Sequence, residues 1–235
     1  MDATMMEYWL FLLRWFHLLA GIVWIGMLYY FNLVQTPFFG TELGGQARSA
    51  VVRGLVPEAL WWFRWAAMFT FLTGWLIILT RWGHQGIPLS DPYMTKILTG
   101  GLMGTLMWAN VWFVIWPAQQ VVIASANQVA GGGQALPNAA ARGALAGRAS
   151  RTNTLLSIGM LLFMGAASHL NTLATNGGNA IYWILFFVLL GAIEFNALST
   201  SSLPTQKPLA TVRGTIHAGL GVSVLFFLIM KLTTG

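Results

Sequence analysis

The sequence of 235 residues contains no cysteine and few charged residues. The absence of cysteine excludes disulfides, iron–sulfur clusters, thiolate zinc sites and haem attached through a Cys-x-x-Cys-His motif. Any metal or cofactor must therefore be held by histidine, methionine, carboxylate or amide groups. Charged residues make up 8% of the chain, whereas they make up about 25% of a typical soluble domain. A soluble fold of this length cannot cover its surface with so few charges.

Long apolar runs take the place of the missing charges, and hydrophobic residues make up 57% of the chain. A helix needs about 20 apolar residues to cross a bilayer, and the sequence has about six such runs. They predict one polytopic domain over residues 1–235, an all-α integral membrane bundle. The expected spans cover about residues 8–34, 60–82, 97–116, 155–173, 181–198 and 209–232. Residues 38–56 are expected to form a loop or an amphipathic surface helix, and Pro117 to kink or end the third span.

The net charge of +6 comes from bases in short connections beside the apolar runs. In a membrane protein this excess sets orientation, so we predict a bilayer partner and no nucleic acid. The connections after spans one, three and five are the more basic ones and are expected to be cytoplasmic. Both termini then face the periplasm of a bacterial inner membrane. Asp2 and Glu7 replace the basic start of a cleavable signal, which predicts a permanent first helix.

Three histidines lie inside predicted spans, where ionisable side chains are costly and mark functional sites. His17, His169 and His217 each have Gly or Ala three or four positions away, on the same helix face. Small residues there leave a flat space beside the imidazole, as a haem with axial histidines requires. The pattern favours haem b, with His17 and His169 as the axial pair and His217 as a ligand to a second haem. The alternative is that each histidine only hydrogen-bonds a neighbouring helix.

A second polar group is predicted on the inner side of the bundle, formed by Glu194, Arg213 and His217. An ion pair is one interpretation of this cluster, and a proton path or substrate-anchoring site is the other. His84 falls in an outer connection and is expected to be solvated. The sequence carries no nucleophile triad, phosphate-binding glycine loop or zinc-protease motif, which argues against hydrolysis and phosphoryl transfer.

Several ordered stretches carry a family resemblance. They cover residues 12–17 with 21–26, 58–65, 110–112 with 117–120, and 149–158 with the downstream His169. In these stretches the chain resembles the membrane domain of the bacterial urate hydroxylase family, also called the urate oxidase N-terminal domain family. The similarity covers spans one to four and is less clear in spans five and six.

The resemblance implies a membrane redox protein that oxidises a small molecule such as urate and passes electrons to a cytochrome c. In family members that oxidise urate, a cytochrome c domain follows the membrane part. This chain has no Cys-x-x-Cys-His, so we expect a separate cytochrome c. His17 and His169 lie on the similar stretches and are carried over as haem ligands. Arg64 and Asn110 are carried over as residues that line the cofactor cavity.

Three functions remain open on the sequence alone. The first is a b-type haem protein that transfers electrons, which makes the chain a candidate membrane oxidoreductase. The second is a non-enzymatic transmembrane subunit of a larger membrane complex. The third is a small-molecule or metal transporter built on the Glu194 cluster. The lack of a visible internal repeat counts against a secondary transporter.

Overall fold

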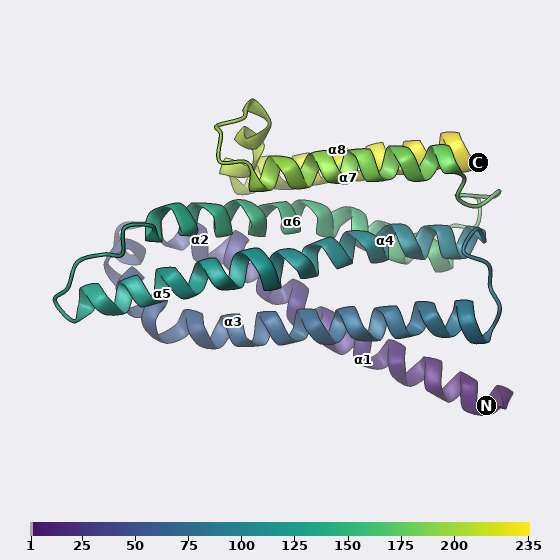
Figure 1. The fold of residues 1–235 in the computed structure, drawn as a ribbon, viewed down its shortest axis with the longest axis horizontal. Helices are drawn as coiled ribbons and strands as arrows, with labels where there is room; N and C mark the ends of the chain where they lie inside the picture. Colours follow the sequence, from purple (N-terminus) through teal and green to yellow (C-terminus); the bar gives the residue numbers. More distant parts are fainter. Residues whose placement is uncertain (1) are drawn as a thin grey trace.

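The computed structural model describes residues 2–235, and within these residues it contains helices and connections but no strand (Figure 1). The first three helices are α1 (Ala3–Tyr29), the short α2 (Thr36–Phe38) and the long α3 (Glu42–Leu79). They are followed by α4 (Pro92–Ala109), α5 (Trp116–Ala130), α6 (Ala139–His169), α7 (Ala180–Leu198) and α8 (Val212–Thr234). Three π-helical segments, η1 (Tyr30–Gln35), η2 (Thr80–His84) and η3 (Asn110–Ile115), and a 3-10 helix, η4 (Pro204–Ala210), complete them. The predicted all-α bundle is confirmed.

The helices form three layers around α6 (Figure 1). The α7–α8 pair covers one side of α6, α4 and α5 run beside it, and α1 and α3 lie on the far side. Both chain termini lie at one end of the bundle, which we call the terminal end. The opposite end holds the connections after α2, α5 and α7 and the bases Arg48, Arg53, Arg142 and Arg148, and we call it the basic end.

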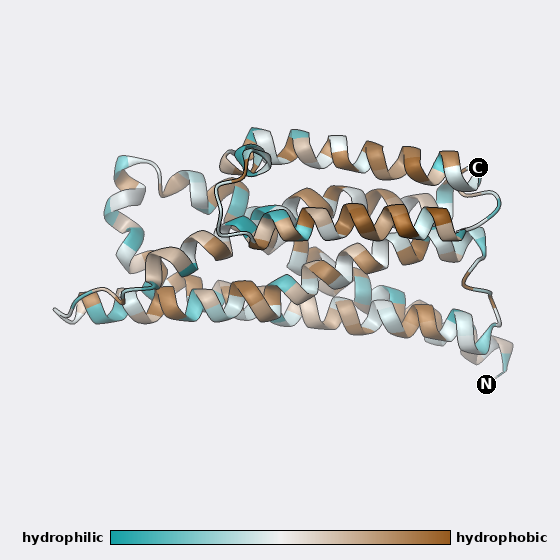
Figure 2. Cartoon of the chain, turned by 45° about the horizontal axis from the view of Figure 1, so that its top comes forward, coloured by the Kyte–Doolittle hydropathy of each residue, from teal (hydrophilic) through white to brown (hydrophobic). Residues whose placement is uncertain are grey.

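Five helical segments within residues 2–235 are long and apolar enough to cross a membrane, so this is a multi-pass membrane protein. Apolar residues predominate along the middle of the helices, and polar residues are more frequent toward the ends (Figure 2). The central helix α6 is not among the five. It buries Thr152, Asn153, Thr154 and Ser157 against its neighbours. A helix surrounded by protein needs no lipid-facing surface and can therefore carry polar groups.

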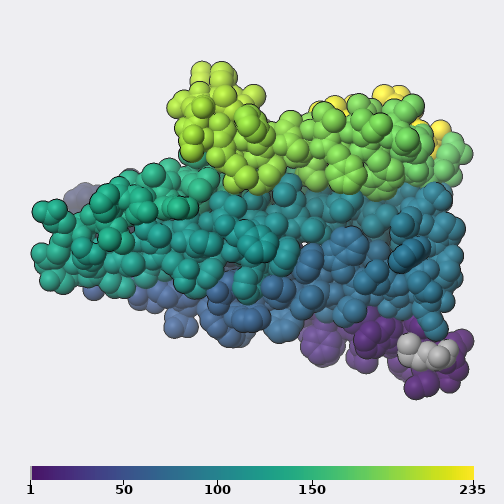
Figure 3. All heavy atoms as spheres, in the orientation of Figure 1, coloured from purple at the N-terminus to yellow at the C-terminus, as the bar shows by residue number. Residues whose placement is uncertain are grey.

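Two of the helical segments are longer than a bilayer requires. Residues 42–84 and 92–130 form continuous segments of 43 and 39 residues, about 60 Å each at 1.5 Å per residue. The hydrocarbon core of a bilayer is about 30 Å thick. At the basic end α5 and α6 accordingly extend past α7 (Figures 1 and 3).

Some predicted boundaries are wrong. The loop or surface helix expected at 38–56 is the beginning of α3, whose first turn is capped by the Thr41 hydroxyl accepting from Gly44 N–H. The fourth span ends at His169 rather than near residue 173. The last helix starts at Val212, because the η4 turn precedes it.

Two π-helical segments are each followed closely by a proline. Pro37 follows η1 by two residues and Pro117 follows η3 by two residues. A proline cannot donate the helical hydrogen bond and crowds the preceding turn. The wider π turn makes room for it, and the chain stays helical through both sites. Pro117 therefore does not end the helix, which runs on to Ala130.

Candidate functional site

A cavity of about 520 Å³ opens between α1, α3, α4 and α6 in the half of the bundle nearer the terminal end. We call it the histidine cavity, because His17 is the histidine in its wall. Binding pockets for cofactors and drug-sized ligands measure about 300–1,000 Å³. The wall is mainly apolar, and its sulfur atoms come from Met160 and Met164 of α6.

The hydrogen bond of His17 involves one of its two ring nitrogens. Its Nδ1 lies 3.2 Å from the Thr73 hydroxyl oxygen. That hydroxyl also lies 2.6 Å from the Phe69 carbonyl. When it donates to this carbonyl it accepts from Nδ1–H, and that arrangement leaves the Nε2 lone pair for another partner. Histidines that bind metals are oriented in this way, with the second ring nitrogen donating to an oxygen.

Glycines leave the space beside His17 open. A Cβ added at Gly74 would come within 2.9 Å of His17 Cε1, so no larger residue fits there without moving the ring. Gly21, Gly101 and Gly104 also line the cavity, from α1 and α4. The sequence predicted the small neighbour Gly21, but Gly74 lies on another helix and was not foreseen.

The other histidines lie elsewhere. His169 is exposed at the C-terminal end of α6 and does not line the histidine cavity, although its neighbour Ser168 does. His217 is exposed on α8, and His84 is exposed at the end of η2. Among residues 2–235, no three His, Cys, Asp or Glu side chains gather as a metal-binding group. None of these three histidines lines the histidine cavity beside His17.

The predicted inner cluster is arranged differently from the expectation. Glu194 accepts a hydrogen bond of 3.1 Å from Asn110 Nδ2, which also donates to Asn153 Oδ1 at 3.0 Å. Asn153 in turn donates to the Met107 carbonyl. Glu194 thus joins a network across α7, η3 and α6, while Arg213 and His217 are exposed on α8. We call the linked side chains of Asn110, Asn153 and Glu194 the amide network.

Arg64 sits against tryptophan rings. Its guanidinium carbon lies 4.0 Å from the ring centroid of Trp116 and 4.9 Å from that of Trp112. Contacts of this kind contribute about 0.5–2 kcal/mol each. Arg64 therefore ties α3 to the segment around η3, and neither Arg64 nor Asn110 lines the histidine cavity. Their place beside a cofactor stays a prediction.

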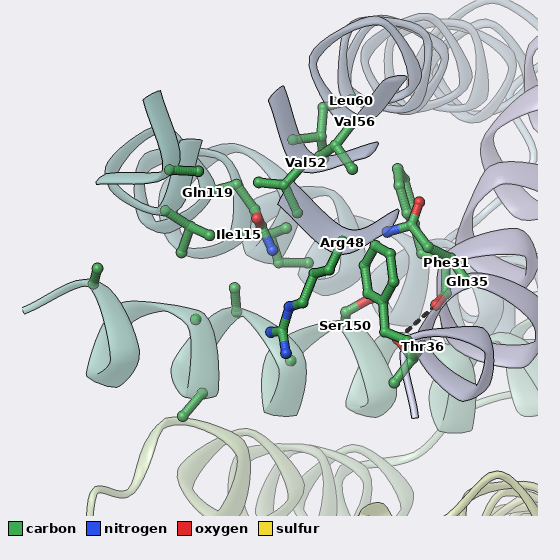
Figure 4. A pocket seen from close by; sticks show the side chains of 18 of the residues that line it. Phe31, Gln35, Thr36, Arg48, Val52, Val56, Leu60, Ile115, Gln119 and Ser150 are labelled. Carbon is green, nitrogen blue, oxygen red and sulfur yellow. Dashed lines mark hydrogen bonds between the residues drawn. The ribbon is translucent and has the colours of Figure 1, made fainter. Parts of the chain in front are cut away.

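A second hollow lies at the basic end and has a volume of about 990 Å³ (Figure 4). We call it the arginine pocket, because Arg48 is the charged residue in its wall. The wall comes from η1, α3, α5 and α6, and the side chains of Arg48 and Gln119 extend into it. Sequence reasoning missed this pocket, since it placed Arg48 in a surface segment and used it only for orientation.

The sequence model of the family described as urate oxidase N-terminal matches residues 89–217, more than half of the chain. The chain belongs to the urate oxidase N-terminal family. Neither the comparison with curated proteins nor that with solved structures gives a match. The matched region holds the amide network, His169 and His217, whereas His17 lies before it.

Proposed function

We propose that the protein is a b-type haem redox protein of the bacterial inner membrane. It takes electrons from a small oxidisable molecule and passes them to a separate cytochrome c. The observation that carries this proposal is the placement of His17. Its Nδ1 lies 3.2 Å from the Thr73 hydroxyl oxygen, and its ring lies in the wall of a cavity of about 520 Å³.

The residues of the histidine cavity fit a haem. His17 Nε2 offers the lone pair for iron, and Gly74 keeps the space beside the imidazole clear. The apolar wall suits the porphyrin faces. When bound, haem supplies an iron that accepts and releases one electron at a time. The protein holds the group, excludes water with its apolar wall and orients the ligand through Thr73.

Two kinds of residue could provide a second ligand to the haem. His169 stays a prediction for it, although the residue is exposed outside the cavity. Met160 and Met164 line the cavity from α6, and methionine paired with histidine is a known haem ligation. Spectra of His169→Ala and Met164→Leu separate the two possibilities. The variant that lacks the true ligand shows a shifted or weakened Soret band.

The family description favours urate as the substrate. The measurement is the reduction of added cytochrome c by the purified chain in detergent, with urate as electron donor. We expect urate-dependent reduction that is absent without the chain and absent in His17→Ala. A chain that contains haem but reduces no cytochrome c with urate would contradict this choice of donor and acceptor.

The amide network is the observation that supports the alternative function of a transporter. Glu194 is half-buried and bonded to Asn110, as expected for a group that carries a proton or binds an ion within a membrane. Uptake that fails in Glu194→Gln would support transport. The network is fully explained as a structural link between α6 and α7, so the haem function has the stronger support.

A further inference from the structure

We propose that the arginine pocket binds a small planar anion that carries ring N–H donors, the class of the oxidised purines and pyrimidines. This deepens the proposed function by giving its substrate a site, and in that respect it rests on it. The site lies at the basic end, away from the histidine cavity near the terminal end.

The charge of the pocket selects an anion. Among the residues that line it, Arg48 carries a charge and no Asp or Glu is present. Arg48 is exposed at the mouth of the pocket, where its guanidinium lies over the Phe39 ring at 5.5 Å. Arginine binds planar anions with two parallel hydrogen bonds and stacks on flat rings.

The hydrogen-bonding groups select a ligand with N–H donors. Gln35 Oε1 is buried without any hydrogen-bond partner within residues 2–235. A buried acceptor left in this state costs about 1–3 kcal/mol, which a ligand N–H would recover. By contrast, Asn32 is already used, because its Nδ2 donates to the Leu28 carbonyl and to Ser150. Gln119 extends into the pocket from the opposite wall (Figure 4).

Much of the remaining wall is apolar, and two phenylalanine rings contribute to it. Phe31 and Phe63 pack edge to face at 5.6 Å between ring centroids. Both line the pocket together with the aliphatic side chains of Val52, Val56, Leu60 and Ile115. Aromatic and aliphatic walls with a few convergent polar groups are typical of small-molecule sites.

Both proline-linked π segments border this pocket. The η1 segment supplies Phe31, Asn32 and Gln35, and η3 supplies Ile115. Isolated π turns inside α-helices are rare and occur frequently at functional sites. Here the wide turn of η1 gathers the unpaired Gln35 and an aromatic ring on one wall.

A lipid phosphate is the other anion available at this position, because the pocket lies where α3, α5 and α6 pass beyond α7. A lipid headgroup can donate to Gln35 through a hydroxyl or ammonium group, but it has no flat ring for the phenylalanines. The pocket chemistry therefore favours the planar heterocycle, and the experiment includes the lipid as a competitor.

The test is equilibrium dialysis of radiolabelled urate against the purified full chain in detergent, at a pH where urate is an anion. We expect saturable binding that Arg48→Gln weakens by about tenfold or more, since a hydrogen bond to a charged group contributes about 1.5–3 kcal/mol. Gln35→Leu is expected to weaken binding by about fivefold. Xanthine, neutral at the chosen pH, should compete poorly.

Arg53→Gln is the matched control. Arg53 is on the same helix, is exposed, donates to the Ser49 carbonyl and does not line the pocket. Its replacement should leave urate binding unchanged. A thermal unfolding transition at the wild-type temperature shows that each variant is folded.

Three results would overturn the site. The first is a folded wild-type chain that does not bind urate, and the second is an Arg48→Gln variant that binds it as tightly as wild type. The third is displacement of urate by an equal concentration of phosphatidylglycerol, which would make the pocket a lipid headgroup site. Dialysis needs neither haem nor electron transfer. Binding without haem therefore contradicts only the proposed redox function, and haem without binding contradicts only this site.

Discussion

Replacing His17 by alanine is expected to abolish haem binding and to remove the Soret band from the purified protein. The reason is that His17 would hold the iron through its Nε2 lone pair, with its Nδ1 oriented by the Thr73 hydroxyl. The variant creates space in the cavity rather than crowding it, so the chain should still fold. The measurement is the visible spectrum at equal protein concentration, with thermal unfolding as the check on folding.

His84→Ala is the matched control for this substitution. His84 is also a histidine beside glycines, but it is exposed at the end of η2 and does not line the histidine cavity. Its replacement should leave the Soret band intact. Imidazole added to His17→Ala should restore part of the absorbance by entering the vacated space. A Soret band of wild-type size in His17→Ala without imidazole would exclude His17 as the ligand.

Asn110→Leu is expected to lower the stability of the bundle by about 2–4 kcal/mol. Asn110 is 1% exposed and donates to both Asn153 and Glu194. Leucine would leave two acceptors without their donor in an interior that offers no water, and each such group costs about 1–3 kcal/mol. Thermal unfolding in detergent should show a clearly lower midpoint.

Asn127→Leu provides the comparison for the amide network. Asn127 is exposed near the end of α5, so the same change of side chain there should be close to neutral, within about 0.5 kcal/mol. Equal midpoints for the two variants would mean that the amide network does not stabilise the fold.

The bundle itself follows from hydropathy. A lipid environment requires about 20 apolar residues per crossing, and that requirement is visible in the sequence of five of the six predicted spans. The beginning of α3 is different, because residues 42–56 extend beyond what a bilayer needs. Its start depends on the Thr41 cap and on packing within the protein, neither of which hydropathy reports. Hydropathy therefore does not distinguish a loop from a helix at residues 42–56.

The candidate site was predictable in part. The cost of an ionisable group in lipid indicated three histidines, His17 among them, without any structure. The His17 partner Thr73 and the clearing glycine Gly74 lie on α3, more than fifty residues along the chain. Contacts of that separation are set by how helices pack, and no local pattern records them. The same limit explains why the sequence suggests an ion pair between Glu194 and Arg213, which lie on consecutive helices. It does not indicate the hydrogen bond between Glu194 and Asn110.

The arginine pocket could not be predicted from the sequence for a related reason. Its polar groups come from four different segments, and each of them looks ordinary on its own helix. The wide turns that gather them precede Pro37 and Pro117. The prolines were visible, but a kink, a helix end and a π turn are all compatible with the same two residues.

The most direct test of a haem redox protein centred on His17 is the pyridine haemochrome of the full chain, purified in detergent from cells supplied with iron. The account predicts the spectrum of haem b, in an amount that rises in proportion to the folded protein and is lost in His17→Ala. A folded, purified chain with no haem absorbance, from cells that load haem into other membrane proteins, would contradict it.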